Sequence, residues 1–246
     1  MKQSKASALI FLIFINLWGI IIPVIYSPAF ILRSSKLADH GAKVWTVVAM
    51  WVLRVFFKVE YEIIGQDKIP KESCIIACKH QSMWETMIMH IACKRPAYAF
   101  KKELLKIPFY GWYLTVMTGI KVDRKGGISS IKDLIKQAKN CLSNGYNVVI
   151  FPEGTRVPID ANSKDYPYQP GIAALYQSCS VKVVPAALNS GYFLNKKTLL
   201  KNSGKITLEF LDPIDAGLGK KEFMNKLESS IEKKSNQLLK QARATK

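Results

Sequence analysis

A histidine and a glutamate lie five positions apart in the stretch CKHQSMWET, residues 78–86, where a short apolar run ends and a helical pattern begins. An imidazole beside a carboxylate can act as a general base, because the carboxylate raises the basicity of the ring and selects the tautomer with a free acceptor nitrogen. Such a base can take a proton from a hydroxyl group. His80 and Glu85 are therefore candidate catalytic residues.

A second interpretation of this stretch is purely structural. Ser82 and Glu85 form the pattern S-x-x-E, the capping box, in which each side chain bonds a backbone N–H of the other residue at a helix start. Glu85 would then be a cap and His80 an ordinary loop residue, although the two interpretations are compatible. Cys78 also raises the hypothesis of a Cys/His nucleophilic pair. Its apolar surroundings argue against this, because a buried neutral thiol is the commoner occupant of such a run.

Two further stretches have residue types suited to an anionic ligand. In FPEGTR, residues 151–156, Gly154 lets a ligand approach the backbone closely, and Arg156 can hold a phosphate through paired hydrogen bonds. In GIKVDRKGG, residues 119–127, Arg124 stands among glycines, and a solvated basic turn is the alternative there.

Short apolar runs alternate along the chain with patterns of helical period, which predict strands and helices respectively. IIAC, VVIF and VVPA lack polar alternation, as is typical of strands buried on both faces. This predicts an α/β fold with a mostly parallel central sheet flanked by helices. Functional residues gather beyond the carboxyl ends of such strands, where both His80 and FPEGTR stand. The predicted strands are residues 58–65, 74–79, 147–151, 181–188 and 205–211, and the predicted helices are 83–93, 128–144, 171–179 and 220–242.

The N-terminal region predicts a membrane segment. No charged residue stands between Lys5 and Arg33, and this stretch exceeds the ~20 apolar residues with which a helix crosses a bilayer. It has no convincing cleavage site, so we expect it to stay attached. Pro23 and Pro28 each tend to kink or end a helix.

A second apolar run, residues 44–57, is interrupted by Arg54. A single span and a helical hairpin embedded in one leaflet both remain open. Residues 1–58 are predicted to form a membrane-anchoring helical region, and residues 59–246 one α/β domain.

The net charge of +18 favours a polyanionic partner. The apolar segment indicates an anionic membrane surface, and no RNA-binding aromatic motif or zinc-finger spacing indicates a nucleic acid. The five cysteines form no CxxC pair and no Cys/His set with zinc spacing. We therefore expect no metal site, and we expect reduced, mostly buried thiols.

The stretches KHQSMWET, VDRKGG, FPEGTR and VVPAAL, in this order, resemble the four motifs of the glycerolipid acyltransferases typified by 1-acyl-sn-glycerol-3-phosphate acyltransferases. The connecting stretch KKELLKIPFYGWYLTVMTGI is similar as well, and the resemblance covers roughly residues 60 to 215. It departs from the family pattern at Glu85, where the family usually has aspartate.

The resemblance implies direct transfer of a fatty acyl group from acyl carrier protein or coenzyme A to the sn-2 hydroxyl of lysophosphatidate, giving phosphatidate. It implies no cofactor beyond this acyl donor. His80 would be the general base and Glu85 would orient its ring. The substrate-binding residues would be Arg124 and Arg156, which hold the phosphate, and Glu153, Gly154 and Thr155, which shape the site.

A lysolipid and its product reside in the bilayer, so we expect the protein at the inner, cytoplasmic membrane with its catalytic domain facing the cytoplasm. Two alternatives stay open. One is an acyltransferase for another lyso-lipid, such as lyso-ornithine lipid or a lysophospholipid. The other is a non-catalytic basic protein that binds membranes.

Overall fold

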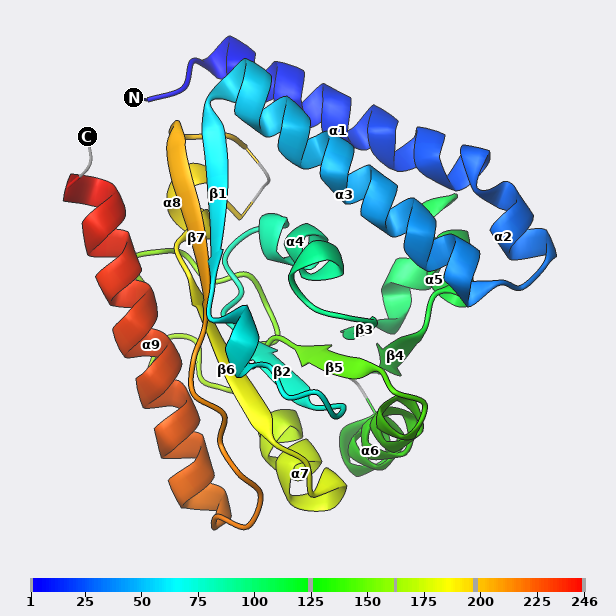
Figure 1. Cartoon of the computed structure of the whole chain (residues 1–246), viewed down its shortest axis with the longest axis vertical. Helices are drawn as coiled ribbons and strands as arrows, with labels where there is room; N and C mark the ends of the chain where they lie inside the picture. The colour runs from blue at the N-terminus through cyan, green and yellow to red at the C-terminus, as the bar shows by residue number, and fades with distance from the viewer. Residues whose placement is uncertain (1, 124–125, 162, 197–198, 245–246) are drawn as a thin grey trace.

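Seven strands form a central sheet in the part of the chain that the structure, a computed structural model, describes (Figure 1). Described are residues 2–123, 126–161, 163–196 and 199–244. The strands are β1 (Val59–Ile64), β2 (Ile75–Cys78), β3 (Pro96–Lys101), β4 (Gly119–Val122), β5 (Asn147–Ile150), β6 (Val183–Leu188) and β7 (Gly204–Phe210). Their order is β1-β7-β6-β2-β5-β3-β4, and only β6 and β7 pair antiparallel. The predicted α/β fold with a mostly parallel sheet is confirmed.

Helices occupy most of the connections between these strands. They are α1 (Lys5–Ile25), α2 (Ser27–Ile31), α3 (Ser35–Phe57), α4 (Trp84–Ala92), α5 (Tyr110–Val116), α6 (Gly127–Ser143), α7 (Pro170–Cys179), α8 (Ser190–Phe193) and α9 (Lys220–Ala244), with short 3₁₀ helices η1 (Gln66–Lys68) and η2 (Lys102–Lys106). The five predicted strands and four predicted helices are all present. The sequence did not predict β3, β4 or α5.

Helices cover both faces of the sheet, which explains why its middle strands are apolar throughout. Successive residues of a strand point to opposite faces. Ile76 and Cys78 of β2 therefore point into an apolar cluster with α3 and α4, whereas Ile75 and Ala77 point into a second cluster with α6, α7 and α9. All four residues of β2 are buried.

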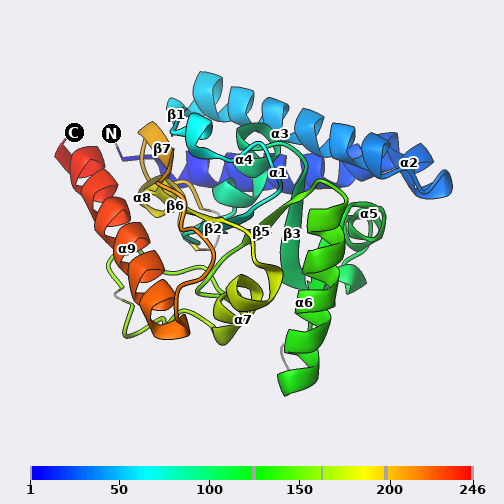
Figure 2. The ribbon, with the colours of Figure 1, turned by 60° about the horizontal axis from the view of Figure 1, so that its bottom comes forward.

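The chain runs out along α1, turns at α2 and returns along α3, so that α1 and α3 lie side by side (Figures 1 and 2). Within the described residues, α1 is the helix long and apolar enough to cross a membrane, with 21 residues and a mean hydropathy of 2.7 in its most apolar window. Pro23 lies in the last turn of α1, and Pro28 lies in the first turn of α2. The two prolines thus mark the bend between the helices.

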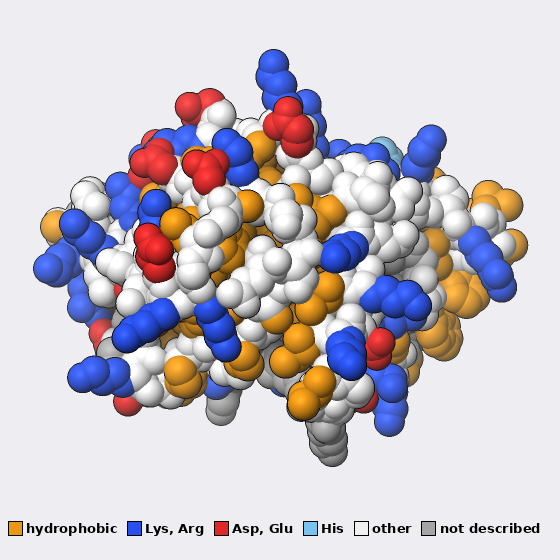
Figure 3. Space-filling view, turned by 90° about the horizontal axis from the view of Figure 1, so that it is seen from below, with side chains coloured by type: hydrophobic (Ala, Val, Ile, Leu, Met, Phe, Trp, Pro, Cys, Tyr) orange, Lys and Arg blue, Asp and Glu red, His pale blue; other side chains and the backbone are white. Residues whose placement is uncertain are grey.

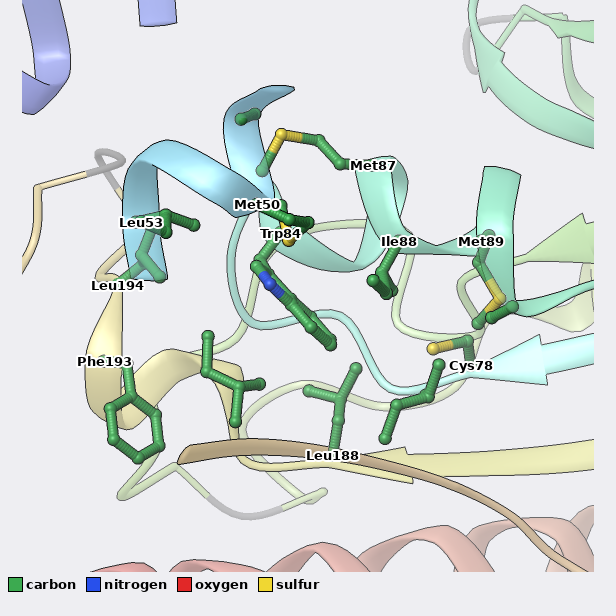
Figure 4. Packing of buried hydrophobic residues seen from close by; sticks show 14 of the residues in the cluster. Met50, Leu53, Cys78, Trp84, Met87, Ile88, Met89, Leu188, Phe193 and Leu194 are labelled. Carbon is green, nitrogen blue, oxygen red and sulfur yellow. The ribbon is translucent and has the colours of Figure 1, made fainter. Parts of the chain in front are cut away.

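The returning helix α3 packs directly on α4. Figure 4 shows Trp84 and Met87 of α4 beside Met50 of α3, in the cluster that also holds one face of the sheet. The Thr46 hydroxyl of α3 donates a hydrogen bond to the Met87 carbonyl at 3.2 Å. The N-terminal hairpin, which consists of α1, α2 and α3, is thereby joined to the helix that follows the histidine motif.

Candidate active site

The histidine motif and the FPEGTR turn meet at one edge of the sheet. β2 and β5 are parallel neighbours, so the segments that follow them leave the sheet at the same edge. The N–H of Lys79 continues the sheet by bonding the Ala186 carbonyl at 2.9 Å, and the N–H of Val157 bonds the His80 carbonyl at 2.7 Å. The end of the turn is therefore tied to the backbone of the histidine.

Two contacts fix the imidazole of His80. Its Nδ1 lies 2.9 Å from Oε1 of Glu85, so Nδ1 donates its hydrogen to the carboxylate and Nε2 is left as the acceptor nitrogen. The Phe151 ring stacks on the imidazole, with centroids 4.1 Å apart and an interplanar angle of 20°. The ring is 13% exposed, whereas the Glu85 carboxylate is fully enclosed.

The Glu85 carboxylate is held by a complete set of donors. Oε1 accepts from the backbone N–H groups of Gln81 at 2.5 Å and Ser82 at 2.6 Å, in addition to His80. Oε2 accepts from the hydroxyls of Ser82 at 2.9 Å and Ser190 at 2.7 Å. Burial alone would raise the pKa of Glu85, but the hydrogen bonds and the charge of His80 hold that pKa below its usual value. Glu85 is thus an anion at neutral pH.

The capping-box interpretation is correct in part. Glu85 accepts from the Ser82 N–H, as the box requires, but the Ser82 hydroxyl accepts from Trp84 at 3.0 Å instead of from Glu85. The helix start therefore aims the carboxylate at the imidazole. The N-cap residue of α4 is Met83, so Glu85 bonds both the backbone just before the helix and the imidazole of His80.

Ser190 is a site residue that the sequence analysis missed. It opens α8 directly after β6, the strand of the VVPAAL box, and its hydroxyl reaches Glu85. The adjacent Gly191 N–H donates to the Gln81 side-chain oxygen at 3.0 Å. The rule that functional residues follow the carboxyl ends of strands would have singled it out.

Arg156 ends the FPEGTR turn, next to Val157, whose N–H bonds the His80 carbonyl. Gly154 has a φ of +64°, a conformation that favours glycine, and its N–H bonds the Phe151 carbonyl at 2.9 Å. Arg156 and Thr155 are half-buried, and Nη1 of Arg156 donates to the Lys196 carbonyl at 3.1 Å. The positive charge of Arg156 also acts on Tyr110, the first residue of α5.

Glu153 lies deeper than the other residues of the turn. It is buried, and its Oε1 is 3.1 Å from Nζ of Lys79, which is itself 2.5 Å from Oε1 of Glu232 in α9. Burial raises the pKa of Glu153 to about 7, an effect that the Lys79 ammonium partly opposes. The contacts of Glu153 are therefore with this ion pair.

The remaining sequence candidates are placed as follows. Arg124 lies outside the described residues. Burial raises the pKa of the Cys78 thiol well above its usual value, and Cys78 points into the apolar cluster with Met89 (Figure 4). This burial argues against a Cys78 nucleophile. Within the described residues, no group of three or more His, Cys, Asp or Glu side chains could hold a metal ion.

Comparison with known proteins identifies the family. A family model described as Acyltransferase matches residues 60–189, which are 130 of the 246 residues. The chain is 37% identical over 162 residues to a 1-acyl-sn-glycerol-3-phosphate acyltransferase of Pseudomonas aeruginosa, with 66% of this chain and 62% of that protein covered. A yeast (Saccharomyces cerevisiae) protein of the same name is 26% identical over 165 residues, with 66% and 54% covered. The chain thus spans less than two thirds of the length of these two relatives.

A solved structure has the same fold. The crystal structure of the 1-acyl-sn-glycerophosphate acyltransferase from Thermotoga maritima matches with a TM-score of 0.76 at 21% identity, over 95% of this chain and 97% of that chain. The hydrogen-bonded pair of His80 and Glu85 and the FPEGTR turn both lie within the residues that the family model matches. With more than half of its length matched by that model, this chain belongs to the acyltransferase family.

Proposed function

We propose that this protein is a 1-acyl-sn-glycerol-3-phosphate acyltransferase, which transfers a fatty acyl group from a thioester to the sn-2 hydroxyl of lysophosphatidate. The observation that carries the proposal is the hydrogen bond between His80 and the buried, ionised Glu85. The printed names of the two relatives support the choice of acceptor.

In the proposed reaction, Nε2 of His80 takes the proton of the sn-2 hydroxyl, and the oxygen of that hydroxyl attacks the thioester carbonyl. The new C–O bond forms, the C–S bond breaks, and the thiolate of the carrier leaves with the proton that the imidazolium returns. Glu85 stabilises the imidazolium and keeps the ring in one tautomer. Transfer is direct, so the protein forms no covalent acyl intermediate.

Arg156 would hold the phosphate of the acceptor. A guanidinium presents paired donors that fit phosphate oxygens, and its charge is not lost at neutral pH. Gly154 and Thr155 would shape the backbone around the headgroup, and Arg124 would add a second positive charge. The acyl donor would be acyl carrier protein or coenzyme A, with no other cofactor.

The apolar hairpin would place this site at a membrane. Ile31, the last residue of α2, and Leu32, which follows it, are 77% and 70% exposed, and Trp112 of the neighbouring α5 is 53% exposed. Figure 3 shows hydrophobic side chains at the end of the molecule where α2 lies, whereas lysines and arginines are scattered over much of the face in view. Because an acyl carrier does not cross a bilayer, the catalytic domain would face the cytoplasm.

The decisive experiment incubates purified, detergent-solubilised protein with a panel of lyso-lipids and a labelled fatty acyl group, which is carried in separate reactions by acyl carrier protein or by coenzyme A. We expect labelled phosphatidate from lysophosphatidate, and we expect His80→Ala to abolish it. His40→Ala, which removes an exposed histidine of α3, is the matched control. Acylation of lyso-ornithine lipid or a lysophospholipid instead would refute lysophosphatidate as the acceptor. No transfer to any acceptor would refute the proposed acyltransferase activity.

Membrane contact is tested by flotation with vesicles of phosphatidylethanolamine and phosphatidylglycerol. The double variant Ile31→Ser/Leu32→Ser is expected to float less than the parent. Ile128→Ser is the control, because Ile128 of α6 is 76% exposed but belongs to neither the hairpin nor α5. Equal flotation of all three proteins would rule out this surface as the membrane contact.

A further inference from the structure

A buried lysine joins three separate parts of the chain behind the candidate active site. Nζ of Lys79 lies 3.1 Å from Oε1 of Glu153 and 2.5 Å from Oε1 of Glu232, and the Tyr168 hydroxyl donates to the same Glu232 oxygen at 3.0 Å. We call these four residues the Lys79 cluster. The Lys79 and Glu153 side chains are almost completely enclosed, and that of Glu232 is largely so.

The members of the Lys79 cluster come from segments that carry the chemistry. Lys79 immediately precedes His80, and Glu153 stands three residues before Arg156 in the FPEGTR turn. Glu232 belongs to α9, which packs along β6 and β7 and contributes no residue to the catalytic pair. Lys79 is therefore the residue through which α9 reaches both the histidine segment and the arginine turn.

The opposite charges in the Lys79 cluster hold the three segments together. One ammonium faces two carboxylates, and neither Glu153 oxygen has a well-directed hydrogen-bond partner among the described residues. A buried carboxylate without well-directed hydrogen bonds depends on its counter-charge, because removal of one member of an ion pair leaves the charge of the other uncompensated. Loss of Glu232 would therefore leave Lys79 with a single, poorly directed ion pair.

We propose that Glu232 is a positioning residue for the acyl-transfer site, which acts through Lys79 to keep the His80 segment and the Glu153–Arg156 turn in register. The proposal rests on the proposed function and deepens it. Glu232 touches neither the catalytic pair nor Arg156 in the described structure; it fixes the position of Lys79 from behind. The alternative is that α9 supports the domain only through its apolar stripe.

The two roles of α9 can be separated by substitution, because the stripe and the carboxylate are different residues. Phe223, Leu227 and Ile231 form the buried stripe, and Glu232→Gln leaves them unchanged. Glu228→Gln is the matched control. Glu228 lies one turn earlier in α9, and it forms no ion pair within the described part of the chain.

The first test is a kinetic one on folded, full-length protein in detergent. Glu232→Gln is expected to lower kcat about tenfold, because a displacement of the base by a fraction of an ångström is costly. It should also raise KM for lysophosphatidate several-fold, since Arg156 shares the turn with Glu153, while KM for the acyl donor stays constant. Tyr168→Phe should act in the same direction with a smaller effect, and Glu228→Gln should behave as the parent.

The second test needs no substrate. Deuterium uptake in peptides that cover residues 79–82 and 152–157 is expected to rise in Glu232→Gln and to stay at the parental level in Glu228→Gln. Unchanged kinetic constants, unchanged uptake, or equal effects of the two substitutions would overturn the positioning role. If the parent protein acylates no lyso-lipid, the proposed function fails while the uptake measurement still decides whether Glu232 holds the two segments.

Discussion

The Phe151 ring covers one face of the His80 imidazole, with centroids 4.1 Å apart and planes 20° from parallel. Phe151 is the first residue of the FPEGTR turn and directly follows β5, so the strand itself carries the ring to the histidine. The stacking leaves Nδ1 directed at Glu85 and limits rotation of the imidazole about its bond to the chain.

Phe151→Ala should therefore lower kcat about tenfold with little change in KM, because the base becomes mobile while the phosphate contact is intact. Steady-state kinetics at saturating acyl donor measures both constants. Phe109→Ala removes an exposed aromatic side chain elsewhere and serves as the control. A large rise in KM with unchanged kcat would contradict a role in orienting the imidazole.

Glu85→Gln is expected to impair both folding and turnover. An amide nitrogen would face the N–H and O–H donors that now point at the carboxylate, and each unsatisfied buried group costs about 1–3 kcal/mol. The imidazolium would also lose its counter-charge. Chemical unfolding and turnover per folded molecule are the two measurements, and normal turnover per folded molecule would reduce Glu85 to a helix cap.

Ser190→Ala tests whether the donor from α8 matters. Oε2 of Glu85 would keep its bond from Ser82 and lose the one from Ser190, at a cost of about 1 kcal/mol in stability. We expect kcat to fall several-fold, and Ser190→Thr, which keeps the hydroxyl, to restore most of it. If the alanine and threonine variants have the same kcat, the hydroxyl does not hold the carboxylate.

Glu153 gives stability a specific dependence on pH. Its pKa is raised from 4.5 to about 7 in the folded protein, so between these values the native state keeps a proton that the unfolded chain has lost. The contribution of Glu153 is thus complete below pH 4.5 and is lost as the pH rises through about 7. At about 1.4 kcal/mol per pKa unit, the loss is about 3 kcal/mol at most.

Glu153→Gln should abolish that part of the pH dependence. The measurement is the unfolding free energy of the parent and the variant at pH 5 and pH 8, in the same detergent. The difference between the two proteins isolates Glu153 from the other titrating groups. A parent that loses no more stability than the variant between these pH values would show that Glu153 is ionised throughout.

The meeting of the two main motifs could be predicted because each follows an apolar run. IIAC and VVIF became the neighbouring parallel strands β2 and β5, and their carboxyl ends bring His80 and Phe151 together. Strands that are buried on both faces are apolar throughout, so the sequence alone reveals them. The rule that functional residues follow the carboxyl ends of such strands then predicts where the candidate site residues lie.

Other elements left no such signal. β3 begins with proline, and β4, at the edge of the sheet, has one fully buried residue, so neither has the apolar run of β2 and β5; both strands are defined by pairing, β3 with β5 and β4 with β3. The partner of Lys79 could not be predicted from the sequence either, since Glu232 lies 153 positions away. The apolar stripe of α9 predicts which face packs, but the position of the helix along the sheet decides which glutamate meets the lysine.

The packing of α3 on α4 sets a limit on how this protein can be trimmed. A fragment that starts at Val59 would uncover Trp84 and Met87 on the very helix whose first turn aims Glu85. Such a fragment should aggregate or lose the arrangement of His80 and Glu85 instead of becoming a folded, water-soluble domain. We expect the N-terminal helices and the α/β part to unfold together for this reason.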